Sequence, residues 1–132
     1  MNAAEHRELI RHVMEDGFNA KDLSVVYDSF HTDYKRHGHG VPSMGSLEEH
    51  VADLKSRQAA FDEARFEIQW ILGDESGMSV FYIFKGRHRQ TGREVSRPSA
   101  AFFTVRNGKI LEGHVFADGA GFAAEVEEAG SI

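Results

Sequence analysis

The spacing of apolar residues changes along the 132-residue chain, and this change constrains the fold most strongly. In the first third, apolar residues recur with a helical period, as at Ile10, Val13 and Met14. From Phe66 onward, apolar residues instead fall in extended segments that short turns separate. Helices followed by a run of hairpin strands indicate an α+β fold, in which the helices pack on one face of an antiparallel sheet.

Local signals divide the first part of the chain into three helices. Gly17 is placed to end the first helix, and Asp22 can cap the second. Residues 32–37 form a short extended segment, and residues 38–45 contain three glycines and one proline, so they form a loop. Ser46 followed by Glu49 is a capping box that opens the third helix.

The second part of the chain contains the hairpins. Phe66, Ile68 and Trp70 alternate with polar residues, and residues 78–84, 95–105 and 109–118 supply three more strands. Asn107-Gly108 is a strong signal for a two-residue hairpin turn, because both residues tolerate positive φ. With a two-residue loop, Arg106 lies opposite Lys109, and the pairs further along follow by counting: Phe103 with Glu112, Ala101 with His114, Ser99 with Phe116, and Arg97 with Asp118.

This register predicts a ligand pocket on the inner face of the sheet. His114, Phe116 and Asp118 share that face with Arg97 and Ser99. A two-residue loop at Thr91-Gly92 adds Tyr82 beside Ala101 and Phe84 beside Ser99, although a bulge there would invert the strand. Small residues among large aromatic ones leave space, and a few polar groups converge on it.

The other face of the predicted sheet is also apolar. It carries Phe81, Ile83, Ala100, Phe102, Leu111 and Val115. An antiparallel sheet with one solvated face should alternate apolar with polar residues, and these strands do not. Because the helices already cover the first face, a second copy of the sheet is the simplest cover, and we expect a homodimer.

Composition excludes several classes of protein. The chain has no cysteine, so it has no disulfide scaffold, thiol nucleophile or zinc-thiolate site. Its apolar runs are too short to span a bilayer, and residues 1–8 do not resemble a signal peptide. The net charge of -6, without a basic patch, argues against nucleic acid as a partner. We expect one cytoplasmic domain over residues 1–132, with a core at about 5–118 and a tail at 119–132.

Asp118 and His114 are the leading candidates for chemistry. A carboxyl group in an apolar pocket can act as a general acid or base, although Asp118 can instead be a strand-end residue that caps a turn at Gly119. A nearby Arg97 would keep Asp118 ionised. His114 can relay a proton, or it can be a hydrogen-bonded histidine of the core.

The other histidines are weaker candidates. His37 and His39 have an alternate-position spacing that could hold a metal, but the next acidic residue after them, Glu48, is distant, so we expect no metal. The remaining histidines, at positions 6, 12, 31, 50 and 88, are expected to be solvated.

Five segments, in their order and spacing, resemble a known family. They are 19–23 (NAKDL), 33–37 (DYKRH), 45–49 (GSLEE), 105–110 (VRNGKI) and 111–118 (LEGHVFAD). Together they resemble the SnoaL-like group, which includes polyketide cyclases, within the nuclear transport factor two-like superfamily. The resemblance covers about residues 5 to 118. It differs at His114, where the family often has tryptophan, and at residues 90–92, where the family's loop is longer.

The resemblance implies a cone-shaped α+β barrel, with three N-terminal helices on a curved antiparallel sheet, and a homodimer. It implies a pocket between helices and sheet that needs no metal or organic cofactor. In the cyclases, the aspartate matching Asp118 is the acid/base of an intramolecular aldol closure, and the histidine matching His37 lies near the pocket.

Two functions therefore remain open, and a third is weaker. The first is an acid/base enzyme of cyclase or isomerase type that acts on a hydrophobic carbonyl compound, with Asp118 and His114 as catalytic residues. The second is a non-catalytic binding or accessory protein with the same pocket, and the third is a dimeric interaction module with a filled core. The predicted substrate-binding residues are His37, Tyr34, Trp70, Tyr82, Phe84, Arg97, Ser99 and Phe116.

Overall fold

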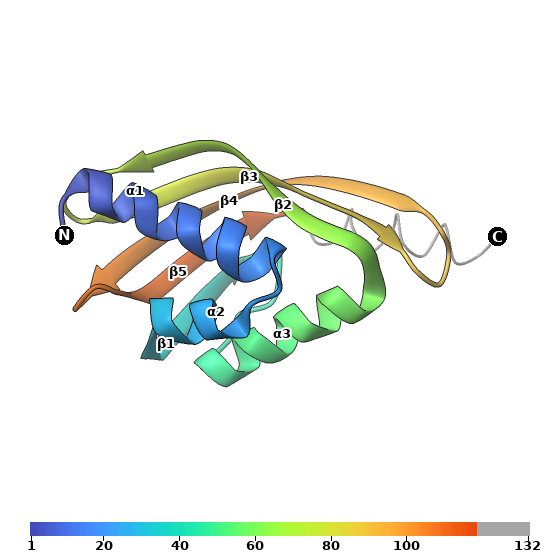
Figure 1. The fold of residues 1–132 in the computed structure, drawn as a ribbon, viewed down its shortest axis with the longest axis horizontal. Coiled ribbons are helices and arrows are strands. Elements are labelled where there is room, and N and C mark those ends of the chain that lie inside the picture. The colour runs from blue at the N-terminus through green and yellow to red at the C-terminus, as the bar shows by residue number, and fades with distance from the viewer. Residues whose placement is uncertain (119–132) are drawn as a thin grey trace.

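The computed structural model describes residues 1–118, and its elements follow the predicted order of helices and then strands (Figure 1). The helical part comprises α1 (Ala3–His12), the π-helical turn η1 (Val13–Asn19) that continues it, α2 (Leu23–Ser29) and α3 (Leu47–Ala60). The strands are β1 (Phe30–His39), β2 (Phe61–Gly73), β3 (Gly77–His88), β4 (Glu94–Arg106) and β5 (Lys109–Ala117). The α+β class is confirmed.

Side-chain caps explain where the helices begin. The side chains of Asn2, Asp22 and Ser46 each accept a hydrogen bond from a backbone N–H in the first turn of the helix that follows. Gly17 does not end the first helix, because the helical conformation continues through η1 to Asn19. Gly17 is buried instead, and a Cβ there would lie 3.3 Å from Cγ1 of Val25, so the glycine allows η1 to pack closely on α2.

The sheet is mixed rather than purely antiparallel. Its strand order is β1-β5-β4-β3-β2, and β1 runs parallel to β5 while the other pairs are antiparallel. The strands curve, and α1, α2 and α3 lie on one side of them (Figure 1). The sheet is not closed, but α3 contacts both edge strands, β1 and β2, and so covers the open side of the cone.

The core fills the space between the helices and the sheet. Its largest fully buried side chains come from α1, η1, α2, β1 and β5: Tyr34, Phe30, Ile10, Met14, Ile110, Val13 and Val26. A smaller cluster of Phe61, Phe84 and Val95 lies under the far ends of β2, β3 and β4. Within residues 1–118, no helix is long and apolar enough to cross a membrane.

The predicted register of the β4–β5 hairpin is wrong by one residue. The turn forms as expected, with Arg106 opposite Lys109, but a bulge follows at once and pairs Thr104 with Glu112. His114 therefore lies opposite Phe102 rather than Ala101. Since successive side chains of a strand point to opposite faces, the bulge turns Glu112, His114 and Phe116 to the outer face, and it turns Val115 inward.

A second bulge moves Trp70 to the outer face. The pairing of β2 with β3 shifts between Ile68 and Trp70, so Ile68 and Ile71 pack against the core while Trp70 is 71% exposed. The predicted β3–β4 register is wrong by two residues, because Tyr82 pairs with Ser99 rather than Ala101. An error of two leaves the faces unchanged, and Tyr82 and Ser99 both point inward as expected.

Candidate functional site

An interior cavity lies where α3 crosses the concave face of the sheet. Its volume is about 70 Å³. Side chains from α1, η1, α3 and every strand line it: Ile10, Met14, Phe18, Arg36, Val41, Asp53, Leu54, Arg57, Phe66, Val80, Tyr82, Ser99, Ala101, Phe103, Val115 and Ala117. Most of this lining is apolar, with a few polar groups, and this composition is typical of a site for a small organic molecule, although the volume is well below the roughly 300 Å³ at which such pockets begin.

The polar wall of the cavity is built around Asp53 of α3. Its Oδ2 lies 3.5 Å from Nη1 of Arg36, on β1, and 3.2 Å from Nη2 of Arg57, one helical turn further along α3. The Arg36 side chain is 8% exposed, whereas those of Asp53 and Arg57 are 25% and 32% exposed. The wall therefore runs from the interior to the solvent and carries two positive charges for one negative charge.

Aromatic rings hold the Arg57 guanidinium in place. Its Cζ lies 5.2 Å from the ring centroid of Phe84 and 6.0 Å from that of Phe66, which are cation–π distances. On the sheet side of the cavity, the hydroxyls of Tyr82 and Ser99 are hydrogen-bonded. Burial raises the pKa of Tyr82, so its hydroxyl keeps its proton and remains a donor.

Of the predicted site residues, Tyr82 and Ser99 line this cavity. Asp118 is exposed and directly follows Ala117, which does line it, so the carboxyl group lies at the end of β5 and outside the cavity wall. Residues 119–132, the predicted tail, lie outside the described part of the chain, as does the proposed turn at Gly119.

Four predicted site residues lie on the outer face of the sheet. His114 and Phe116 are turned outward by the bulge in β5, and Trp70 by the bulge in β2. His37 stacks on His114, with a ring centroid distance of 4.5 Å, so it also lies outside rather than near the cavity. None of the four lines the cavity, because each belongs to the opposite side of the sheet.

The other predicted residues belong to the packing around the cavity. Tyr34 is 1% exposed and packs edge-on against Phe30. Phe84 is buried against Phe61 and receives the Arg57 guanidinium. Arg97 is partly exposed and lies opposite Phe84 in the β3–β4 register.

Sequence reasoning missed the charged wall. Asp53 and Arg57 are four residues apart in a predicted helix, a spacing at which opposite charges commonly pair, and this signal was available. The meeting of Asp53 with Arg36 was not visible, because it depends on how α3 crosses β1. Two histidines predicted to be solvated, His6 and His50, are also buried.

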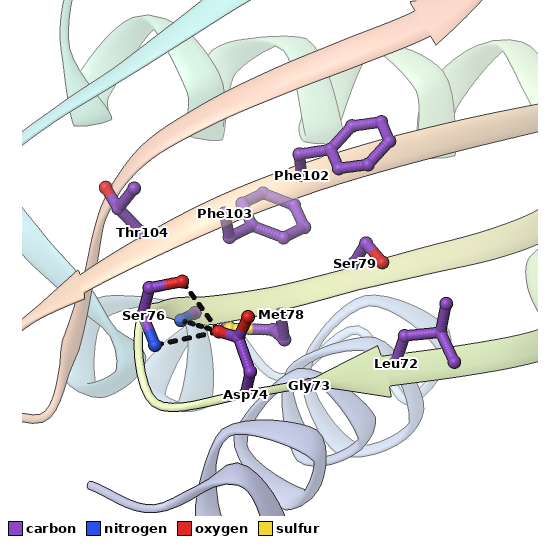
Figure 2. Close-up of a pocket in the computed structure, with 10 residues that line it drawn as sticks. Leu72, Gly73, Asp74, Ser76, Met78, Ser79, Phe102, Phe103 and Thr104 are labelled. Atoms are coloured by element: carbon purple, nitrogen blue, oxygen red, sulfur yellow. Dashed lines mark hydrogen bonds between the residues drawn. The ribbon is translucent and has the colours of Figure 1, made fainter.

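A second hollow, of about 350 Å³, opens on the outer side near the β2–β3 turn (Figure 2). Leu72, Ser79 and Phe102 line it from three neighbouring strands. Asp74 accepts hydrogen bonds from the Ser76 hydroxyl (2.6 Å) and backbone N–H (2.8 Å), and these bonds lower the pKa of Asp74. The carboxylate is thus occupied in shaping the turn, and the hollow is an indentation of the apolar outer face.

Comparison with known proteins identifies one family and many similar folds. The model of a SnoaL-like domain matches residues 10–113. A search of curated proteins found no match.

Three solved structures illustrate the likeness of fold. A protein proposed to be a SnoaL-like polyketide cyclase, from a Jannaschia species, has a TM-score of 0.83 at 15% identity, with 94% of this chain and 92% of that chain covered. IdmH of Streptomyces antibioticus, proposed to be a polyketide cyclase, has a TM-score of 0.78 at 21% identity, with 91% and 96% covered. AclR of Streptomyces galilaeus, proposed to be a hydroxylase, has a TM-score of 0.81 at 18% identity, with 98% of each chain covered. At these identities, the likeness concerns the fold alone.

Proposed function

Because this chain belongs to the family of SnoaL-like domains, we propose that it binds a small, largely apolar carbonyl compound in its interior cavity and catalyses proton transfer on it, as a cyclase or isomerase does. The observation that carries this proposal is the convergence of Arg36, Asp53, Arg57, Tyr82 and Ser99 on an otherwise apolar cavity. Such a site holds the apolar part of a ligand against apolar side chains, and it surrounds one oxygen of the ligand with hydrogen-bond donors.

The residues of the cavity divide into two roles. The Tyr82 hydroxyl and the Arg57 guanidinium donate to the carbonyl oxygen, and they stabilise the negative charge that develops there as an enolate forms. Asp53 is the carboxylate of the wall, and it removes the proton from the carbon beside the carbonyl. Asp118 is the alternative base that the family resemblance implies, at the end of the strand whose preceding residue lines the cavity.

Exchange of α-protons for deuterium tests this function without knowledge of the natural substrate. The chain is incubated in D₂O with small ketones such as cyclohexanone and acetophenone, and the loss of the α-proton signal is followed by ¹H NMR. We expect saturable exchange above the buffer rate, reduced at least about tenfold in Asp53→Asn, because an amide cannot accept the proton. Glu48→Gln, an exposed carboxylate on the same helix, is the matched control and should keep the rate.

The same experiment separates the alternatives. Exchange that survives Asp53→Asn and is lost in Asp118→Asn assigns the base to the end of β5. Saturable binding of the ketones, seen as line broadening, without exchange in any variant identifies a binding protein. One observation favours a binding protein, since the Asp53 carboxylate is already occupied by ion pairs with Arg36 and Arg57.

We also propose that two copies of the chain associate through the outer face of the sheet. Large apolar side chains are exposed there on β2, β4 and β5: Trp70 (71%), Leu72 (67%), Phe102 (52%) and Phe116 (43%). Phe116 and Phe102 contact each other edge-on at 5.9 Å, so the surface is continuous across two strands. A contiguous apolar face of this kind favours a self-complementary interface.

A further inference from the structure

A cluster of imidazole and carboxylate groups lies on the outer side of the sheet, at the edge formed by β1 and β5. The parallel pairing of these strands places Lys35, His37 and His39 beside Glu112, His114 and Phe116, respectively. Alternate residues of each strand share a face, so the two strands turn their histidines and Glu112 to the same side. No charged residue of the interior cavity belongs to this cluster.

The potential ligand atoms are already close together. One ligand atom from each of His37, Glu112 and His114 lies within 4.8 Å of the other two. Nε2 of His37 is 3.5 Å from Oε2 of Glu112, and Nε2 of His114 is 3.7 Å from Oε1 of the same carboxylate. Two ligands of a tetrahedral zinc ion, at bond lengths near 2.0–2.1 Å, are about 3.3 Å apart. Small side-chain rotations would therefore bring the three groups into coordination.

One of these atoms makes no hydrogen bond within residues 1–118. It is Nε2 of His37, which is inaccessible to solvent and whose contact with Glu112, at 3.5 Å, is an ion pair only if the ring is protonated. A buried polar atom without a hydrogen bond costs free energy, and a bound ion shared with the carboxylate would satisfy it. The side chains themselves are 43% to 45% exposed, which leaves a route for an ion to enter.

His39 supplies the support that a metal-binding histidine normally has. Its Nε2 lies 3.0 Å from Nδ1 of His114, on the side of the ring away from Glu112. A histidine that binds metal through Nε2 carries its proton on Nδ1 and usually donates it to a second group, which fixes the ring. His39 is in place to accept that proton, and its ring stacks on Phe116 at 4.2 Å.

We propose that His37, Glu112 and His114 form a binding site for a divalent transition-metal ion of the zinc type, with His39 as the residue that orients His114. Two imidazoles and one carboxylate suit zinc, and they leave further positions on the ion for water or another ligand. The ion would join β1, an edge strand, to β5, so its binding also stabilises the sheet. This site is separate from the cavity, and the proposal does not depend on the function proposed for the cavity.

Zinc titration of the full chain tests the site. The metal-free protein competes with a chromophoric chelator for Zn²⁺, which gives stoichiometry and affinity, and thermal unfolding is followed with and without Zn²⁺. We expect one ion per chain with micromolar or tighter affinity, and a rise in Tm of about 5 °C at saturating zinc. His37→Gln and His114→Gln should each weaken binding more than about tenfold and remove the rise in Tm, and His39→Gln should weaken it by about tenfold.

His12→Gln is the matched control, because His12 is also a partly exposed histidine beside a carboxylate, with Nδ1 2.7 Å from Asp16. It should bind zinc as the wild type does. The proposal is overturned if the wild type binds no zinc at micromolar concentration. It is also overturned if the double variant of His37 and His114 binds zinc as tightly as the wild type, which would place the ion elsewhere.

Discussion

His50 lies in an aromatic environment that does not tolerate its charge. Ring centroids of Phe18, Phe30 and Tyr34 lie 6.0, 5.1 and 5.1 Å away, and neither ring nitrogen of His50 has a hydrogen-bond partner within residues 1–118. Burial, followed by repulsion from Arg36 and Arg57, lowers the pKa of His50 to about 3. The folded chain therefore holds this imidazole neutral at pH values where the unfolded chain protonates it.

Because of this difference, the free energy of unfolding falls as the pH falls. The folded pKa of His50 lies below the unfolded value of about 6.5. The folded state is therefore not penalised by this residue above pH 6.5, and it loses free energy of unfolding as the pH falls from there toward 3. From pH 7 to pH 5, the free energy of unfolding should fall by about 2 kcal/mol through this one residue. In His50→Phe, which suits the aromatic cluster, that loss should disappear. Urea unfolding at the two pH values measures it.

His12→Gln is the control for that measurement, since His12 is exposed and its replacement should leave most of the pH dependence in place. Equal pH dependence in the wild type and in His50→Phe would contradict the assignment.

At the scale of elements, the bulge near Leu111 decides which side chains of β5 face the core. Val105 pairs with Ile110 and Thr104 with Glu112, so Leu111 is the additional residue. Its deletion would remove the bulge and leave Glu112 opposite Thr104 and His114 opposite Phe102, so the inner and outer sides of β5 would not change. We expect that deletion to lower the free energy of unfolding by no more than about 2 kcal/mol, because it removes one partly buried side chain and moves no charged group inward. Thermal unfolding checks this.

Leu111→Ala keeps the bulge, so it separates the loss of the side chain from the loss of the bulge. It should cost about 1 kcal/mol, since Leu111 is only partly buried. A deletion that costs more than about 3 kcal/mol would contradict this expectation, because it would mean that β5 needs the bulge itself to pair with β4.

The start of α3 depends on one hydroxyl group. The Ser46 side chain accepts a hydrogen bond of 3.2 Å from the backbone N–H of Glu49, while the Glu49 carboxylate accepts one from Gly45. Ser46→Ala should lower the free energy of unfolding by about 1 kcal/mol, because a helix N–H loses its partner. Ser56→Ala, in an exposed position of the same helix, should be neutral or slightly stabilising. Urea denaturation of both variants measures their free energies of unfolding, and equal losses in the two variants would contradict the capping role of Ser46.

These elements show what a sequence reveals and what it does not. Caps such as Asp22 and turns such as Asn107-Gly108 act within a few residues, so the helix starts and the hairpin were predictable. A bulge has no comparable local signal, and one extra residue exchanged the inner and outer sides of β5. The charged wall joins Arg36 to Asp53 through the crossing of α3 over β1, which depends on the whole fold.

At the scale of the whole molecule, the apolar outer face predicts the oligomeric state. Phe102 is half exposed and contacts Phe116, so Phe102→Glu places a charge within the proposed interface. We expect light scattering to show a dimer for the wild type and a monomer for this variant, because burying an unpaired carboxylate costs a large desolvation free energy. Tyr27→Ser, an exposed aromatic on the helical side, should remain dimeric. A dimeric Phe102→Glu would exclude this face as the interface.

The place of β5 in the sheet has a consequence for the order of folding. β5 is the last strand of residues 1–118, yet it lies between β1 and β4 and carries Val115 and Ala117 to the cavity wall. Pairing of β1 with β5 is a contact between distant parts of the chain, and such contacts form late and slow the folding of a domain. During synthesis, β1 leaves the ribosome long before its partner strand does. Until β5 emerges, a nascent chain leaves the edges of β1 and β4 unpaired and lacks the core side chains Ile110 and Val115, and such unpaired edges and exposed apolar surfaces are what chaperones bind.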